Sequence, residues 1–202
     1  METKKPTIEI FRRKDAEEFT KALSDPESRA EFGSAAAMTA AEAAAFLQRA
    51  ASLLAEKQPG DERLEYLVRN SGILREYMVK LIDEDVKCRG PLRRALKEGD
   101  ERTIEAARQP AVAIAQEIIA MMQQALSFAD EMADKAGAEE KTWLAAACEL
   151  AMGAVRCCRH YIVDMSLLST DETYRFVIHR ENEITLNQCA EVYARVLEKT
   201  IA

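Results

Sequence analysis

An acidic residue lies on the apolar face of one predicted helix. Between Ile73 and Leu92 the apolar residues recur at steps of three and four, which is the spacing of one face of an α-helix, and Asp85 falls on the same face. The apolar members of this face are Leu74, Met78, Leu81, Cys88 and Leu92. Burying a carboxylate costs on the order of several kcal/mol unless it is paired or protonated. Asp85 is therefore expected to have either a structural partner or a chemical role.

The chemistry open to a buried carboxyl group is proton transfer. Burial raises the pKa of a carboxyl group, so Asp85 could give and take a proton as a general acid and base. The structural alternative is that Arg89, one helical turn later, neutralises Asp85. Asp83 lies about 200° around the helix from Asp85, among charged residues, and is expected to be solvated.

A second group of candidate residues is weaker. Cys157 and His160 stand three residues apart on a predicted helix and could face a metal ion. The sequence has no CxxC or HExxH motif, and free cysteines often serve as small core residues. We therefore expect no metal. The five cysteines are an odd number without paired spacing, which favours a reducing compartment such as the cytoplasm.

Composition favours an all-α single domain. The chain has 202 residues, of which 48% are apolar, with only seven glycines and five prolines. The formal net charge of -7 argues against a nucleic-acid partner, because phosphate binding needs a basic surface. No signal peptide is apparent, and Glu42 and Gln116 interrupt the longest nonpolar stretches. The sequence thus predicts a soluble protein without a membrane partner.

Helical periodicity and end signals predict a bundle of about six or seven mostly antiparallel helices. Residues 1–14, with a short β-like run from Thr7 to Phe11, are expected to be a tail or docking strand, and residues 15–202 a single helical domain. The predicted helices are Asp15 to Ser24, an alanine-rich helix after a Gly33-Ser34 turn, a helix from Asp61 bent or ended by Gly90-Pro91, Asp100 to Arg108, Pro110 to Lys135 ending by Gly137, Glu139 to Leu168, and a last helix begun by Ser169 to Glu172.

Small side chains dominate the alanine-rich helix. Such residues let another helix approach closely, so residues 34–54 are expected to form a tight helix crossing or part of a homodimer contact. A charged replacement at Ala44 would then weaken the dimer.

Four segments in this order resemble the formiminotetrahydrofolate cyclodeaminase and methenyltetrahydrofolate cyclohydrolase family. They are DAEEFTKALS with the Gly-Ser turn and alanine-rich helix, LIDEDVKCRG, AARQPAVAIAQ, and LAMGAVRCCRHYIVDMSLLSTDETY. The resemblance runs from about Asp15 to the last helix. It implies an all-helical homodimer that handles the one-carbon unit bridging N5 and N10 of tetrahydrofolate.

The resemblance also implies roles for particular residues. The acid in the segment matching LIDED corresponds to Asp85 and is the expected catalytic residue. Gly33 and Ser34 would shape the turn beside the pterin, and Arg89 or Lys141 would meet the folate carboxylates. The substrate would be a tetrahydrofolate derivative, and the chemistry needs no metal.

The chain departs from the family pattern at several positions. Glu31-Phe32-Gly33-Ser34 stands where the family reads roughly GGGS, Lys141-Thr142 replaces a Ser-Asp pair, and Cys88-Arg89 replaces an Ala-Phe pair. Two alternatives therefore stay open. One is a non-catalytic homodimer of the same fold that has lost the folate site or binds another small anionic ligand, and the other is an unrelated helical interaction module.

Overall fold

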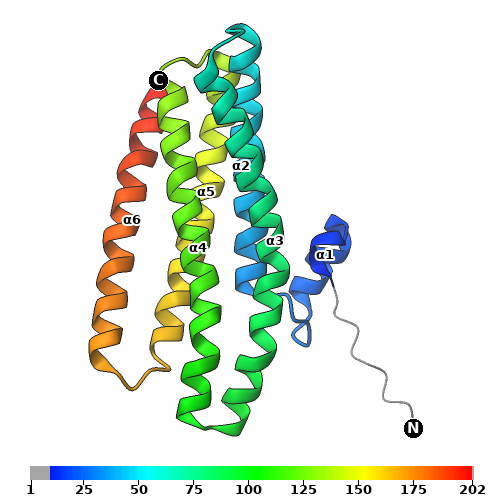
Figure 1. Cartoon of the computed structure of the whole chain (residues 1–202), viewed down its shortest axis with the longest axis vertical. Coiled ribbons are helices and arrows are strands. Elements are labelled where there is room, and N and C mark those ends of the chain that lie inside the picture. Colours follow the sequence, from blue (N-terminus) through cyan, green and yellow to red (C-terminus); the bar gives the residue numbers. More distant parts are fainter. Residues whose placement is uncertain (1–9, 202) are drawn as a thin grey trace.

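The computed structural model describes residues 10–201 and is built from helices (Figure 1). No strand occurs within that range, so the predicted all-α single-domain bundle is confirmed. Six α-helices and one short 3-10 helix follow one another in residues 10–201. They are the 3-10 helix η1 (Phe11–Arg13), α1 (Ala16–Ser24), α2 (Phe32–Lys57), α3 (Glu62–Glu98), α4 (Glu101–Ala133), α5 (Ala138–Ser166) and α6 (Glu172–Ile201).

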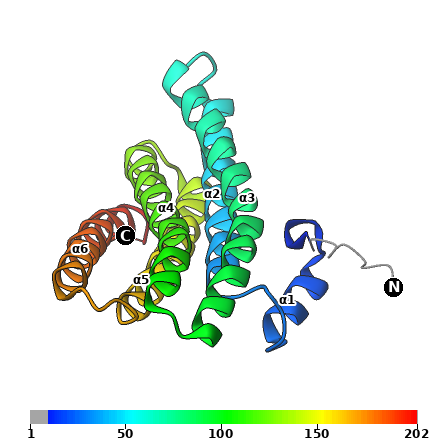
Figure 2. The same ribbon diagram turned by 60° about the horizontal axis from the view of Figure 1, so that its bottom comes forward.

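The five long helices run side by side, and successive ones are antiparallel (Figure 1). Helix α2 packs mainly against α3 and α5 and also touches α4, whereas α6 covers α4 and α5 at the edge of the bundle. Helix α1 lies outside the bundle, beside α3, in both views (Figures 1 and 2). Helix α2 is therefore the central element, and its N-terminus lies next to the C-terminal half of α3.

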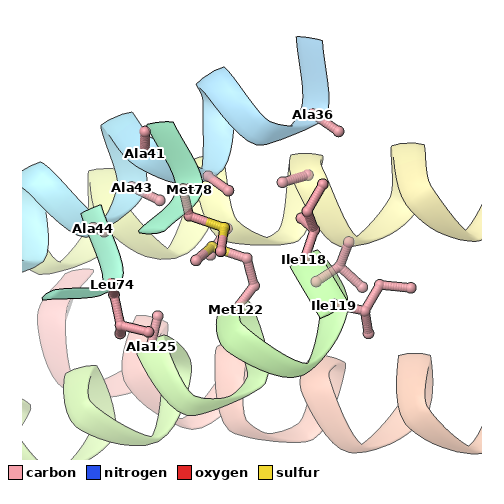
Figure 3. Packing of buried hydrophobic residues seen from close by; sticks show 14 of the residues in the cluster. Ala36, Ala41, Ala43, Ala44, Leu74, Met78, Ile118, Ile119, Met122 and Ala125 are labelled. Atoms are coloured by element: carbon pink, nitrogen blue, oxygen red, sulfur yellow. The ribbon is translucent and has the colours of Figure 1, made fainter. Parts of the chain in front are cut away.

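Most alanines of α2 are buried inside the single chain. Figure 3 shows Ala43 and Ala44 facing a layer in which Met78 of α3 and Met122 of α4 lie close together. The predicted tight helix crossing is present, because small side chains let α3 and α5 pack closely on α2. The test proposed at Ala44 is wrong, however, since this residue is fully buried in the protomer and a charge there would disrupt the core.

Two prolines lie inside helices rather than between them. Helix α3 continues past Pro91 and ends at Gly99, whose left-handed φ of 74° suits glycine. Helix α4 likewise contains Pro110, so the predicted break between two shorter helices is wrong. A proline in a helix removes one backbone hydrogen bond. Burial of apolar residues after each proline, such as Leu92 after Pro91 and Val112 after Pro110, compensates for that loss.

Several predicted helix ends are confirmed. Asp15 accepts a hydrogen bond from the Glu18 amide, and Asp61 caps α3 in the same way. The last helix is capped by Asp171. Gly137 precedes α5 as its N-cap rather than ending α4, which already stops at Ala133.

The segment before α1 is docked on the bundle. Of the predicted β-like run, residues 7–9 lie outside the described residues, and Phe11 instead begins the 3-10 helix with its ring buried. Asp83 accepts hydrogen bonds from the Phe11 amide at 2.8 Å and the Arg12 amide at 3.2 Å, and the Arg12 guanidinium lies 3.1 Å from the same carboxylate. The prediction that Asp83 is solvated is therefore wrong, because an N-terminal segment covers that face of α3.

Replacing Asp83 by alanine should release this segment. The buried Phe11 amide and the neighbouring Arg12 amide would lose their acceptor, at a cost of about 1–3 kcal/mol. Faster hydrogen exchange at these two amides, with the rest of the bundle unchanged, is the expected result. Asp83→Asn is the control, since its amide oxygen can still accept both bonds. Unchanged exchange in the alanine variant would show that the carboxylate does not anchor the segment.

Helix α4 is the most apolar of the long helices by composition over an 18-residue stretch. By length and composition it could cross a membrane, with a mean hydropathy of 1.2 over its most apolar 18-residue stretch. In the bundle, 56% of that stretch is buried against other helices. This is the pattern of a core helix. The prediction that Gln116 interrupts the apolar stretch is wrong, because the most apolar 18 residues of α4 include it.

Candidate functional site

Asp85 lies on α3 and is buried against the first turn of α2. Its exposed fraction is 1%, which confirms the inward orientation inferred from helical spacing. One carboxylate oxygen accepts two hydrogen bonds from Ser34, from the backbone amide and from the hydroxyl, each at 2.9 Å. The first amides of a helix have no partner within the helix and carry partial positive charge. Asp85 therefore caps α2 from a neighbouring helix.

Glycine is required at position 33 because there is no room for a side chain, and not because of its backbone conformation. A Cβ atom at this position would lie 2.1 Å from a carboxylate oxygen of Asp85. The prediction of a turn at Gly33-Ser34 is wrong, because α2 already begins at Phe32 and both residues belong to its first helical turn. The absent side chain is what allows Asp85 to reach the Ser34 amide.

Gly33→Ala should accordingly displace the Asp85 carboxylate. We expect a loss of about 1–3 kcal/mol in the free energy of unfolding, the usual cost of overpacking a buried site. Denaturant unfolding measures it. Gly90→Ala is the matched control, because a Cβ there meets nothing within 4 Å and should not destabilise the fold. Equal stability of the two variants would contradict the close approach of Asp85 to Gly33.

Arg89 lies between two carboxylates and an aromatic ring. Its Nε donates to Asp85 at 3.3 Å, and its Nη1 lies 3.2 Å from the Glu31 carboxylate. The guanidinium carbon also sits 4.1 Å from the centre of the Tyr161 ring, within the range of a cation–π contact. The ion pair between Arg89 and Asp85 that the helical spacing suggested is thus present.

Glu31 and Tyr161 were not recognised as site residues from the sequence. Glu31 occupies the N-cap position of α2, but its side chain makes no capping hydrogen bond there. Its carboxylate instead pairs with Arg89 and Arg93. The sequence signals were departures from the resembled family: Glu31 stands where the family has glycine, and Tyr161 begins the segment that stands where the family has an asparagine-bearing segment.

Burial is the largest cause of the pKa shifts of Asp85 and Tyr161. It raises the pKa of Asp85, and the neighbouring Glu31 charge acts in the same direction, while Arg89 and the Ser34 hydrogen bonds oppose the rise. Burial also raises the pKa of Tyr161 to about 12, so its hydroxyl stays neutral. Because Asp85 binds a proton more tightly in the folded chain than in the unfolded chain, its contribution to stability falls as pH rises through its folded pKa.

Lys141 does not belong to this site in the same chain. It follows Glu140, which forms an ion pair with Lys57 at the C-terminal end of α2. Ser34 lies at the opposite end of α2, about 35 Å away at about 1.5 Å per residue. The prediction that Lys141 joins Asp85, Gly33, Ser34 and Arg89 is therefore wrong within one protomer, because helix length separates them.

An open hollow of about 420 Å³ borders the site. We call it the arm hollow, because the segment that carries α1 forms one of its walls. It is lined by Leu23, Asp25, Pro26, Ser28, Ala30, Glu31, Phe32, Ala35 and Arg93. The Phe32 side chain is 67% exposed at this place. Glu31 contacts both the hollow and Arg89, so a ligand in the hollow lies one side chain away from the Arg89–Asp85 pair.

The sequence of residues 15–183 matches the family described as formiminotransferase-cyclodeaminase. The match includes the helix that carries Asp85 and the first turn of α2. The chain belongs to this family. Family membership confirms the resemblance found in the four sequence segments, and it makes tetrahydrofolate chemistry the context in which the buried carboxyl group should be considered.

A solved structure has the same fold. The crystal structure of formiminotetrahydrofolate cyclodeaminase from Thermotoga maritima, at 2.80 Å resolution, aligns with a TM-score of 0.86 and 18% sequence identity. The alignment covers 94% of this chain and 96% of that chain. No curated protein matches the sequence significantly. At this identity the structural likeness establishes the fold of the cyclodeaminase-like domain and no more.

Proposed function

We propose that this family member acts on a tetrahydrofolate derivative, as a cyclodeaminase or a cyclohydrolase, with Asp85 as general acid and base. The observation that carries the proposal is a buried carboxyl group with a raised pKa, held by Ser34 at the N-terminus of α2. A carboxyl group of this kind can exist in both protonation states nearer to neutral pH than an exposed aspartate can.

One carboxyl group suffices for the proton transfers. In cyclodeamination, N10 attacks the carbon of the protonated formimino group (C=NH₂⁺) and loses a proton, and the resulting amino group gains a proton to leave as ammonia, which leaves the cationic methenyl bridge. Asp85 would accept the first proton and supply the second. In cyclohydrolysis, it would accept a proton from water as the oxygen adds to the methenyl carbon. It would return that proton to the ring nitrogen as one carbon–nitrogen bond breaks, while the added hydroxyl loses its proton to solvent and becomes the formyl oxygen. Because Asp85 is 1% exposed, Glu31 and Arg89 must move before a substrate reaches it.

A titration with folate derivatives tests this function directly. Purified protein should show saturable binding of 5-formimino- or 5,10-methenyltetrahydrofolate, and turnover of one of them. Absence of both binding and turnover in folded protein would refute the enzyme proposal.

The structure also favours a second candidate, a non-catalytic member of the family. Asp85 already has a structural role as the cap of α2, and Arg89 and Glu31 cover it. Such a protein would fold into the same bundle and bind no folate. The titration above separates the two candidates, since only the first predicts saturable binding.

We further propose that the chain forms a homodimer through α2 and α5. Part of their surface carries half-buried apolar side chains, namely Met38, Phe46, Trp143, Leu150 and Cys157. Gly153 lies on the same stripe of α5, exposed, although glycine in a helix costs about 0.5–1 kcal/mol relative to alanine. Close approach of a second chain would account for this glycine.

Gly153→Glu should therefore weaken the dimer without unfolding the protomer. A Cβ atom at this exposed position meets nothing within 4 Å in the protomer, so we expect the fold to tolerate a side chain there. Sedimentation velocity over a wide concentration range measures the change. A wild-type protein that stays monomeric, or a Gly153→Glu protein that dimerises as strongly as wild type, would contradict the proposed contact.

A further inference from the structure

The Glu31 carboxylate is held by two arginines from the next helix. Arg89 approaches one carboxylate oxygen at 3.2 Å, and Arg93 donates to the other. Arg93 also donates to the backbone carbonyl of Ser28 at 2.8 Å, which fixes its guanidinium in the loop before α2. Guanidinium groups match the planar shape of a carboxylate and bind it through paired N–H donors. The two arginines and Glu31 thus form an occupied carboxylate-binding site.

The same site has donors that Glu31 does not use. Among the described residues, neither Nη2 of Arg89 nor the Tyr161 hydroxyl has a hydrogen-bond partner. Both residues are deeply buried, with exposed fractions of 4% and 5%. A buried donor without a partner is unfavourable, because it has lost its hydrogen bonds to water. The site therefore offers more donors than the single internal carboxylate satisfies.

Solvent reaches the Glu31 carboxylate that occupies this site, whereas it does not reach Asp85. The Glu31 side chain is 25% exposed and lines the arm hollow together with Arg93. Glu31 is also joined to α2 only through its backbone, because its side chain makes no capping hydrogen bond. It can leave the two arginines without breaking a hydrogen bond of α2. Exchange of Glu31 for another carboxylate would leave the net charge of the site unchanged.

We propose that Arg89 and Arg93 form a binding site for a ligand carboxylate, and that Glu31 occupies this site in the free protein. A carboxylate entering through the arm hollow displaces Glu31 and takes its place on both guanidinium groups. The inference goes beyond folate turnover, because it concerns binding by the free protein and holds whether or not Asp85 performs catalysis. Glu31 then acts as an internal competitor that keeps affinity for simple carboxylates low.

The experiment removes the competitor and measures affinity for acetate. We expect Glu31→Ala to bind acetate about tenfold or more tightly than wild type, because a tethered carboxylate competes at a high effective concentration. Titrations followed by NMR at constant ionic strength, with chloride as the balancing anion, give the affinities. Glu27→Ala is the matched control, since it removes an exposed negative charge from the same loop. It should bind acetate as weakly as wild type.

Two further variants keep the test decisive. Adding Arg93→Met to Glu31→Ala should abolish the gained affinity, because one of the two guanidinium groups is lost while the buried Arg89–Asp85 pair stays intact. If Glu31→Ala fails to fold, Glu31→Gln keeps the side-chain size without the charge and should show the same gain. Equal acetate affinity in the folded Glu31 variant, Glu27→Ala and wild type would overturn the proposal. Tighter binding of inorganic phosphate than of acetate would also overturn it, since the site would then prefer a tetrahedral anion.

Discussion

An Asp85→Asn protein should keep its helices and lose about 10² to 10⁴ in the rate of any cyclodeaminase or cyclohydrolase reaction. The asparagine oxygen can still accept the hydrogen bonds from the Ser34 amide and hydroxyl, so α2 stays capped. The amide cannot exchange a proton, which removes the general acid and base. Circular dichroism checks the fold, and kcat with the preferred folate derivative measures the loss.

Asp83→Asn supplies the comparison for this experiment. It changes an acid of the same segment two residues away, and its oxygen still accepts the Phe11 and Arg12 amides. Its rate should match that of wild type. If both variants lose activity equally, the effect comes from the segment and not from proton transfer by Asp85. If Asp85→Asn keeps the full rate, the proposed role of Asp85 is refuted.

Arg89→Met should cost about 3–5 kcal/mol in the free energy of unfolding, the range for breaking a buried ion pair by removing one partner. The variant leaves Asp85 buried without its cation and facing Glu31. The loss should be larger at about pH 8 than at about pH 5. Removing Arg89 raises the pKa of Asp85 further, so protonation relieves the buried charge as the pH falls. Denaturant unfolding at the two pH values measures both effects.

Arg69→Met is the matched control on the same helix. Arg69 is well exposed and forms only a long surface ion pair with Glu65, so its loss should change stability by less than about 1 kcal/mol. Equal losses for the two variants, or a loss at Arg89 that does not vary with pH, would show that Arg89 does not neutralise Asp85.

The sequence by itself determined the helical class and the orientation of Asp85. Helical periodicity depends only on neighbours within one element. The apolar face that includes Leu74 and Met78 was therefore enough to predict that Asp85 points inward. Caps such as Asp15 and Asp61 were predictable for the same reason, since the cap and the amides that it binds lie within three residues. The four family segments added the folate context, which no helical pattern contains.

Tertiary structure alone decided what covers each face and what each helix end meets. Asp83 looked solvated because its own helix surrounds it with charges, yet the segment at Phe11 packs over it. Lys141 does not belong to the site, because it lies near the C-terminal end of α2 and the site lies at the N-terminal end. Sequence order does not express that distance. The pairing of Glu31 with Arg89 joins residues of different helices. Such contacts depend on how helices dock, and docking is set by packing between elements rather than by the pattern within one of them.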